Sequence, residues 1–382
     1  MAIDLSSLIF VGTILILPAE LFCFFLIVSL SINLEFGYTG IPNFGQVLFV
    51  ASGGFLAGSV AYRLMVYLLH LKGDVFAYEA QFITEIDAHL SADPLEAVGL
   101  FLLMLLIGGS IGVLFGYLSS YPAIRLREDY LGMLLLAAGE FFNIFSVAYT
   151  PFLGGSLGSF APDPISDLGN IVGQPELAVL GVLALFTVLI YLYSERVGRA
   201  PLGRTLRALR DNETATEAVG KDNVALRRKA LLIGSALAGV AGVLWLSFMP
   251  LMTPGTTTEA TFNRVTDTFI PFVIVIIGGA ANNRGVLAGT FVYLLIYNAF
   301  SQGATFLGPS LYGTLALVGL DNIKFMLIGT LVILILLRRP QGLVPEKPTL
   351  TMKRSRLRQI ADSIKGKPNS KDAPNKETGQ KS

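Results

Sequence analysis

The sequence is poor in the residues that build metal centres, disulfides and soluble surfaces. Its 382 residues include one cysteine, two histidines and one tryptophan, and only 14% are charged. The single Cys23 excludes a disulfide framework within the chain. His70 and His89 are too few and too isolated for the usual ligand spacing of a metal centre. We therefore predict no metal site. Without clustered Asp, Ser, Cys or His in the apolar segments, we also expect no catalytic site and no enzyme activity.

The sequence is rich in long apolar segments. Apolar residues make up 53% of the chain, and its mean hydropathy is +0.64. A spanning helix needs about 20 mostly apolar residues, because each residue rises ~1.5 Å across ~30 Å of hydrocarbon. The pattern predicts an all-α polytopic membrane protein with about nine spans (roughly eight to ten). These lie near 8–32, 46–70, 96–119, 131–150, 176–194, 230–249, 267–281, 286–303 and 323–338.

Two stretches rich in glycine and amide side chains interrupt these spans. GGAANNRG, at 278–285, predicts a broken or re-entrant hairpin between the two spans that flank it. The stretch 33–45 is either a plain cytoplasmic loop or a broken half-helix near a translocation path. Non-helical backbone is tolerated at membrane depth only where protein or a water-filled cavity satisfies it.

Basic residues are concentrated in two segments. Of 28 Lys and Arg, nine lie in 195–229 and twelve between Arg338 and the C-terminus. The loop 72–95 carries one Lys against five acids, and 151–175 carries no basic residue. Because positive loops stay in the cytoplasm, we expect the N-terminus outside, the C-terminus inside and a multi-pass location in the cell membrane.

This pattern gives a simple domain organisation. Residues 1–345 are expected to form a transmembrane domain, with 72–95 as an extracytoplasmic insert and 195–229 as a cytoplasmic loop. Residues 346–382 form a basic tail with few apolar residues, which we expect to be disordered in the cytoplasm.

The block 195–229 contains the signals of a short helix. Thr214 and Glu217 have the spacing of a capping box, and Gly220 is suited to end a helix that runs from about 214 to 219. Such a short helix is not stable alone, so we expect it to dock against another surface. The alternative is a solvated loop whose basic residues only fix the topology.

Four stretches together resemble the branched-chain amino acid ABC transporter permease family. GRTLRALRDNETATEAVGKDNVALRRKALLIGSALAGVAGVL, at 203–244, is similar to the family's cytoplasmic loop and following span. GYTGIPNFGQVLFVASGGFLAG (37–58), RLREDYLGMLLLAAGEFFNIF (125–145) and RRPQGLVP (338–345) agree with the family in the same order. The resemblance covers roughly 30–345.

The resemblance implies the membrane subunit of a type II ATP-binding cassette importer. Such a subunit binds no cofactor itself, since ATP is used by partner subunits. The expected partners are two ATPase subunits, a homologous permease or a second copy of the chain, an extracytoplasmic substrate-binding protein and the lipid bilayer, with no nucleic acid. The substrate stays open among branched-chain amino acids, other amino acids, amides and urea. The residues implied in coupling to the ATPase are Arg204, Arg207, Arg210, Asp211, Asn212, Glu213, Thr214, Ala215, Glu217, Ala218 and Gly220.

Polar residues at membrane depth are the candidates for the substrate pathway. Glu140 is the most informative, because a carboxylate near a bilayer centre costs about 2.5–3.5 kcal/mol and should face protein or water. It either bonds a broken helix or lines the path. An ion-coupled secondary transporter is the alternative function, and it would need such intramembrane carboxylates. The pathway candidates are Asn33, Asn43, Gln46, Glu140 and Asn143.

Overall fold

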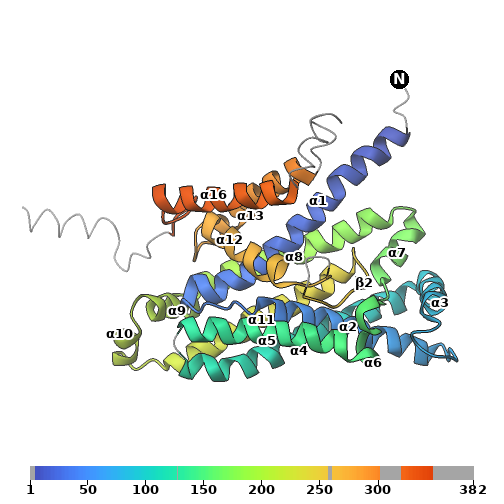
Figure 1. Ribbon diagram of the computed structural model, residues 1–382, viewed down its shortest axis with the longest axis horizontal. Coiled ribbons are helices and arrows are strands. Elements are labelled where there is room, and N and C mark those ends of the chain that lie inside the picture. The colour runs from blue at the N-terminus through green and yellow to red at the C-terminus, as the bar shows by residue number, and fades with distance from the viewer. Residues whose placement is uncertain (1–4, 127, 257–259, 302–319, 347–382) are drawn as a thin grey trace, which may run out of the picture. The chain divides into compact units, whose positions relative to one another are not determined.

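The computed structural model describes residues 5–126, 128–256, 260–301 and 320–346, which are mostly helical (Figure 1). The chain divides into two units, Met1–Glu346 and Lys347–Ser382. The tail that the sequence predicts to be disordered, beyond Glu346, lies outside the described residues.

The first half of the Met1–Glu346 unit consists of long helices and one helical insert. In chain order the elements are α1 (Leu5–Ile32), the π-helix η1 (Asn33–Gly37), α2 (Gln46–Leu68), α3 (Glu79–Ala92), α4 (Pro94–Arg125), α5 (Glu128–Ala148), α6 (Thr150–Leu153), the 3₁₀-helix η2 (Gly155–Leu157) and strand β1 (Ser159–Phe160). The insert predicted at 72–95 therefore contains one helix, α3.

The second half of this unit contains the charged block 195–229 and a broken pair of helices. Its elements are α7 (Pro164–Val172), α8 (Pro175–Arg199), α9 (Pro201–Asp211), α10 (Glu213–Ala218), α11 (Asn223–Leu246), β2 (Leu251–Met252), the π-helix η3 (Val265–Phe269), α12 (Ile270–Gly278), α13 (Asn283–Ser301) and α16 (Leu320–Arg338). The two strands pair antiparallel, with Ser159 opposite Met252.

The predicted all-α membrane class is confirmed, but the count of about nine spans is not. Within the described residues, six helices are long and apolar enough to cross a membrane, or up to seven if a bent pair is counted as one span. That pair is Val265–Gly278 with Asn283–Ala299, bent by 116°. The predicted break at GGAANNRG is therefore present. Gly279 (φ +113°) turns the chain there in a conformation that favours glycine.

Glycines allow α2, α4 and α11 to pack with their backbones close together. A Cβ added at Gly53 would lie 2.5 Å from Gly239 Cα, and one at Gly239 would lie 2.2 Å from Gly108 O. At Gly112 it would lie 2.2 Å from Ser235 O. Lipid gives helices no hydrophobic drive to associate. Helices in a membrane therefore depend on van der Waals packing, and small residues strengthen it by letting the backbones approach closely.

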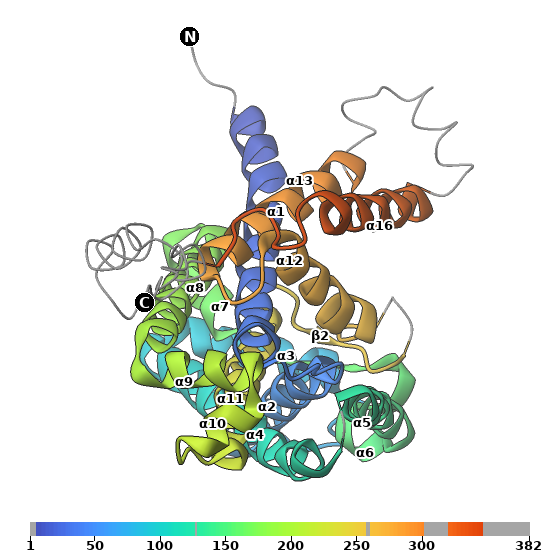
Figure 2. The same ribbon diagram turned by 90° about the vertical axis from the view of Figure 1, so that its left-hand side faces the viewer.

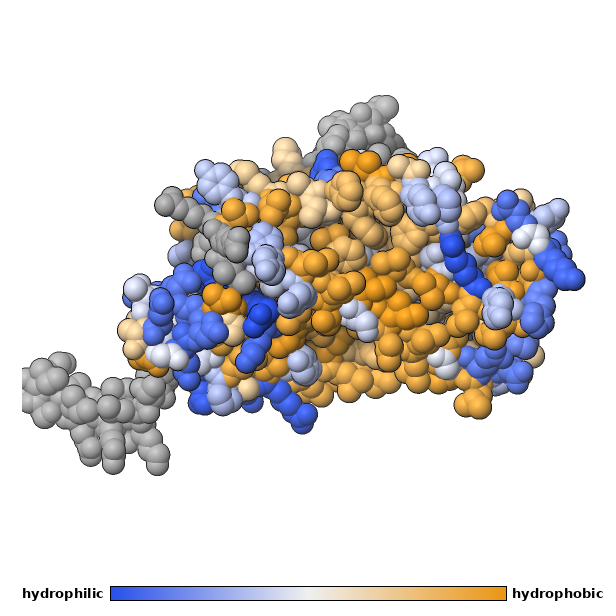
Figure 3. Space-filling model, turned by 90° about the horizontal axis from the view of Figure 1, so that it is seen from below, coloured by the Kyte–Doolittle hydropathy of each residue, from blue (hydrophilic) through white to orange (hydrophobic). Residues whose placement is uncertain are grey.

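The helices of the first unit lie on two sides of α1. Helices α12, α13 and α16 lie on one side, and α2, α4, α5 and α11 lie on the other (Figures 1 and 2). A broad apolar band covers the middle of the face in Figure 3, and hydrophilic residues gather at both ends. Helices α9 and α10 lie at one end, and α3 lies at the other (Figure 1). This is the pattern of a protein whose long helices cross a bilayer.

Candidate coupling and pathway sites

Helix α9 is held against the membrane helices by one apolar face. Pro201 opens the helix in its first turn, where a missing N–H costs nothing. Leu206 and Leu209 are buried in a cluster with Leu34 and Tyr38, from the C-terminal end of the first span. Helix α9 therefore rests on the end of that span.

Helix α10 has hydrogen-bonded caps at both ends. The Asn212 side chain accepts from the Ala215 N–H at 2.9 Å, so Asn212 is the N-cap. At the other end Gly220 (φ +76°) donates to Glu217 O, and Lys221 donates to Thr216 O, which is a Schellman motif. The predicted terminator Gly220 is confirmed.

The predicted capping box is wrong. Helix α10 begins at Glu213, one residue earlier than expected, because Asn212 has the extended backbone of a cap (φ −160°, ψ 104°). Thr214 therefore lies inside the helix. Glu213 forms an ion pair with Arg227 of α11 at 2.9 Å, and Asn223 donates to Glu213 O.

The outward face of α10 is small and uncovered. Thr214, Ala215, Glu217 and Ala218 are exposed, whereas Thr216 is buried. Val219, directly after the helix, is 73% exposed. Close approach of a second backbone to this face would meet only short side chains and one carboxylate.

Two of the arginines expected to contact an ATPase form ion pairs within this chain. The Arg207 Nε lies 2.6 Å from Glu346 Oε1, and the Arg210 Nη2 lies 2.9 Å from Glu346 Oε2. Arg210 also donates to Gly37 O at 2.7 Å, and Arg207 lies over the Tyr38 ring at 4.7 Å. One carboxylate thus bridges two guanidinium groups of α9, an arrangement that we call the Glu346 latch.

The other residues of this set remain at the surface. Arg204 and Asp211 are exposed, and Asp211 forms an ion pair with the neighbouring Arg210. Of the predicted coupling residues, the structure thus leaves α10 and Arg204 uncovered and turns Arg207 and Arg210 inward.

The segment that carries Glu346 also pairs with the break between α12 and α13. Leu343 N donates to Ile277 O at 2.9 Å, and Val344 N donates to Gly278 O at 3.0 Å. The Asn282 side chain donates to Val344 O. The segment 341–346 therefore connects α9 to the broken pair of helices.

The amide-rich stretch after the first span is buried in the protein. Asn43 Nδ2 donates to Glu35 Oε2 at 2.6 Å and to Gln46 Oε1 at 3.2 Å. Asn33 donates to Asn283 Oδ1 and accepts from the Ala281 N–H. These bonds tie the π-helix η1 to the break between α12 and α13, while the Oε1 atom of Glu35 stays buried without a hydrogen-bond partner.

This burial decides between the two interpretations of 33–45. The stretch is not a plain cytoplasmic loop, because Asn33, Asn43 and Gln46 are all fully buried. In this structure the side chains of these three pathway candidates form hydrogen bonds to other buried residues of the chain.

Glu140 has a charged partner that the sequence did not indicate. Arg264 Nη1, just before η3, lies 2.8 Å from Glu140 Oε1. The contact is an ion pair without an aligned hydrogen bond to that oxygen. The Arg264 side chain is 43% exposed and that of Glu140 is 19% exposed. Asn143, one turn along α5, is buried and donates to Phe262 O at 3.4 Å.

Three carboxyl groups meet where α3 packs on α7, and we call them the α3–α7 carboxylate cluster (Asp87, Asp163 and Asp167). Burial raises the pKa of Asp163 to about 8. Burial, and then the charge of Asp87, raise the pKa of Asp167 to about 7. The pKa of Asp87 is raised by burial to about 6. The Asp167 Oδ1 accepts from Ser91 at 3.4 Å, and its Oδ2 is buried without a partner.

Two charged residues that pair with the predicted site residues were missed from the sequence. Arg264 had a signal, because it is the only basic residue between Lys229 and Arg284. Glu346 had none, since its partners lie 136 residues or more earlier in the chain.

Comparisons with known proteins agree with this architecture. The family described as "Branched-chain amino acid transport system / permease component" matches residues 16–336. A probable branched-chain amino acid transport permease protein LivM of Methanocaldococcus jannaschii is 35% identical over 356 residues, which cover 92% of this chain and 96% of that protein.

More distant relatives are similar over a shorter stretch. The high-affinity branched-chain amino acid transport system permease proteins LivM of Salmonella typhimurium and Escherichia coli are each 26% identical over 270 residues. Those residues cover 65% of this chain and 58% of each relative. No solved structure matches.

These matches give the class of the molecule. It is a transport permease with several membrane spans, not an enzyme, and as the membrane subunit of an ATP-binding cassette importer it works with ATPase and substrate-binding partners. The chain belongs to the family of branched-chain amino acid transport system permease components.

Proposed function

We propose that this chain imports branched-chain amino acids and that α10 is its coupling helix. In this proposal α10 docks on one ATPase subunit, and a second copy or a homologous permease supplies the other half of the pore. A second ATPase and an extracytoplasmic binding protein complete the assembly. The names of the relatives support the substrate, and the fully capped, uncovered α10 supports the docking role.

The single observation that carries the docking role is the construction of α10. Its six residues are too few for a stable isolated helix, yet Asn212, Gly220 and the Glu213–Arg227 pair hold them in place. The side that remains free carries short side chains, which permit close contact with a partner. A solvated loop that served only to fix topology would not require this construction.

The Glu346 latch supplies a route for movement in this proposal. A shift of α10 and α9 acts through Arg207 and Arg210 on Glu346. The segment 341–346 then carries it to the break between α12 and α13, where Gly278 and Gly279 bend the chain. The same end of the molecule holds the basic block 195–229, and because basic loops tend to stay in the cytoplasm, we propose that this end is cytoplasmic and that the N-terminus lies outside.

Within the membrane we propose that the Glu140–Arg264 pair faces the pathway or the second permease. Glu140 is near the middle of the span Asp129–Ala148. Charged groups facing lipid at that depth are costly, so the partly exposed Arg264 should face water or protein. A zwitterionic amino acid offers an ammonium and a carboxylate to such a pair.

A co-purification experiment tests the docking role. Ala215→Trp places a large ring on the free face of α10, and it should abolish both ATPase co-purification and amino acid uptake. Ala88→Trp is the matched control, because Ala88 lies on α3 at the opposite end. The proposal is wrong if Ala215→Trp retains its ATPase partners and its uptake at the level of the control.

A further inference from the structure

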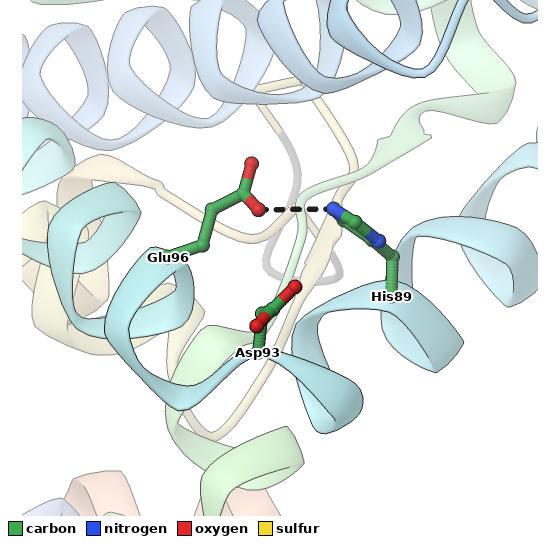
Figure 4. Close-up of side chains that lie close together, drawn as sticks. All are labelled: His89, Asp93 and Glu96. Carbon is green, nitrogen blue, oxygen red and sulfur yellow. Dashed lines mark hydrogen bonds and ion pairs between the residues drawn. The ribbon is translucent and has the colours of Figure 1, made fainter.

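The corner where α3 meets α4 brings one imidazole and two carboxylates together. His89 lies in the last turn of α3, Asp93 is shared by the end of α3 and the start of α4, and Glu96 lies in the first turn of α4. One ligand atom from each lies within 4.8 Å of the other two. Figure 4 shows the three side chains converging from the two helices. Among the residues that the structure describes, this is the one such group of three.

Asp93 is the N-cap residue of α4, but its side chain does not cap the helix. An aspartate at a helix N-cap usually accepts a hydrogen bond from the second or third N–H of the helix. Asp93 occupies the N-cap of α4 without such a bond. Asn212 and Asp222 of the same chain, by contrast, do accept one. The Asp93 carboxylate is instead directed toward His89 and Glu96 (Figure 4).

The charge of the group is unbalanced. Two carboxylates lie close together, and the imidazole of His89 is their one nearby partner within the group, with Nε2 at 2.9 Å from Glu96 Oε2. Like charges at this separation repel each other. A divalent cation between them would offset both charges and accept the imidazole nitrogen as a ligand.

We propose that His89, Asp93 and Glu96 form a binding site for Zn²⁺ or a similar divalent transition metal. Zinc accepts imidazole nitrogen and carboxylate oxygen at about 2.0–2.2 Å, and it commonly uses three protein ligands with water in the fourth place. Tetrahedral ligands at that distance lie roughly 3.4 Å apart. Donor atoms within 4.8 Å therefore reach this geometry by small side-chain rotations. The imidazole disfavours Ca²⁺ and Mg²⁺, which prefer oxygen ligands alone.

The site would fix the angle between two helices. Its ligands come from both sides of the turn at Asp93 (φ −118°, ψ 87°). Helix α3 in turn holds β1, because Glu79 Oε1 accepts from the Ser159 hydroxyl and from Phe160 N, each at 2.6 Å. A bound metal would thus set the position of the whole insert. The sequence predicted no metal site because the chain has only two histidines. That criterion does not detect a site with one histidine and two carboxylates at the spacing H-x₃-D-x₂-E.

Zinc titration of the full-length chain tests the proposal. The protein is purified in detergent with a tag that lacks histidine, and Zn²⁺ binding is measured by calorimetry, with Co²⁺ absorption as a second probe. We expect one Zn²⁺ per chain and a rise in the melting temperature. His89→Ala and Glu96→Gln should each raise the Kd by at least about 100-fold, since outer-shell partners alone account for 10–100-fold.

Matched controls separate this site from unspecific binding. His70→Ala removes the other histidine, and Glu85→Gln removes an exposed acid of α3, so both should bind Zn²⁺ as the wild type does. The melting temperature of Glu96→Gln without metal shows whether that variant folds. The proposal is overturned if Zn²⁺ binds without a 1:1 limit, if His89→Ala binds it equally well, or if Ca²⁺ binds as tightly.

Discussion

Replacing Glu346 by Gln should loosen the segment 341–346 from the break between α12 and α13. The change keeps the shape of the side chain but removes the charge that bridges Arg207 and Arg210. Hydrogen bonds to charged groups contribute about 1.5–3 kcal/mol each. The latch side chains are only 17–26% exposed, so solvent screens them incompletely. Gln keeps an acceptor for the one hydrogen bond in the latch, from Arg210 Nη2, but Arg207, which is held by the ion pair alone, loses its charged partner. We therefore expect a loss of about 1.5–3 kcal/mol.

Amide hydrogen exchange measures this loss directly. Leu343 N–H and Val344 N–H are hydrogen-bonded to Ile277 O and Gly278 O only while the segment is docked. Local opening exposes them, and its free energy sets their protection. Since about 1.4 kcal/mol is a factor of ten, protection should fall roughly 10- to 100-fold in Glu346→Gln.

Glu217→Gln is the control for this experiment. It removes an exposed acid of α10 that lies outside the latch, and it should leave the protection of both amides unchanged. If Glu346→Gln also leaves it unchanged, the backbone pairs alone hold the segment, and the latch cannot transmit movement from α9.

Three other sites give predictions of their own. Glu140→Gln should retain more uptake than Glu140→Leu, because Gln keeps a polar acceptor beside Arg264 and Leu does not; equal uptake of amino acid into vesicles would remove the pair from the pathway. Gly342→Ala should lower the melting temperature, because its Cβ would lie 2.4 Å from Gly279 Cα at φ +78°, whereas Gly329→Ala, with open space around it, should not. Raised pKa values mean that the folded α3–α7 carboxylate cluster binds protons more tightly than the unfolded chain does, so stability should fall from about pH 4 to about pH 8. Asp167→Asn should flatten that fall in thermal unfolding scans, and an equally steep fall would contradict the assignment.

Helix α10 shows which features of a short helix can be predicted from the local sequence. Gly220 was identified from the sequence because a glycine after a short polar helix is a local signal, and its φ of +76° confirms it. The start of the same helix was misplaced by one residue. Asn212 and Thr214 are both good cap residues, so the local sequence leaves the choice between them open. In the structure Asn212 is the cap, and Glu213, the first residue of the helix, pairs with Arg227 of α11.

The pathway candidates show the limit of composition. The sequence marks the amides of 33–46 and Glu140 as polar groups within or beside apolar segments, where each needs a hydrogen-bonding or charged partner. Composition does not say which partner satisfies them. Asn33 bonds Asn283 across 250 residues, while Glu140 is paired with Arg264.

By itself the sequence determined the class of this protein, because hydrophobic length and charge bias are properties of continuous segments. An apolar run long enough to span the bilayer, a basic block or a glycine-rich break can be recognised from the segment itself, without knowing its tertiary contacts. The tertiary structure alone decided the pairs that connect these segments: Glu346 with α9, Asn33 with Asn283, and Arg264 with Glu140. Such pairs form only where packing brings distant residues within bonding distance. In this chain that packing depends on the close backbone approach of helices at their glycines.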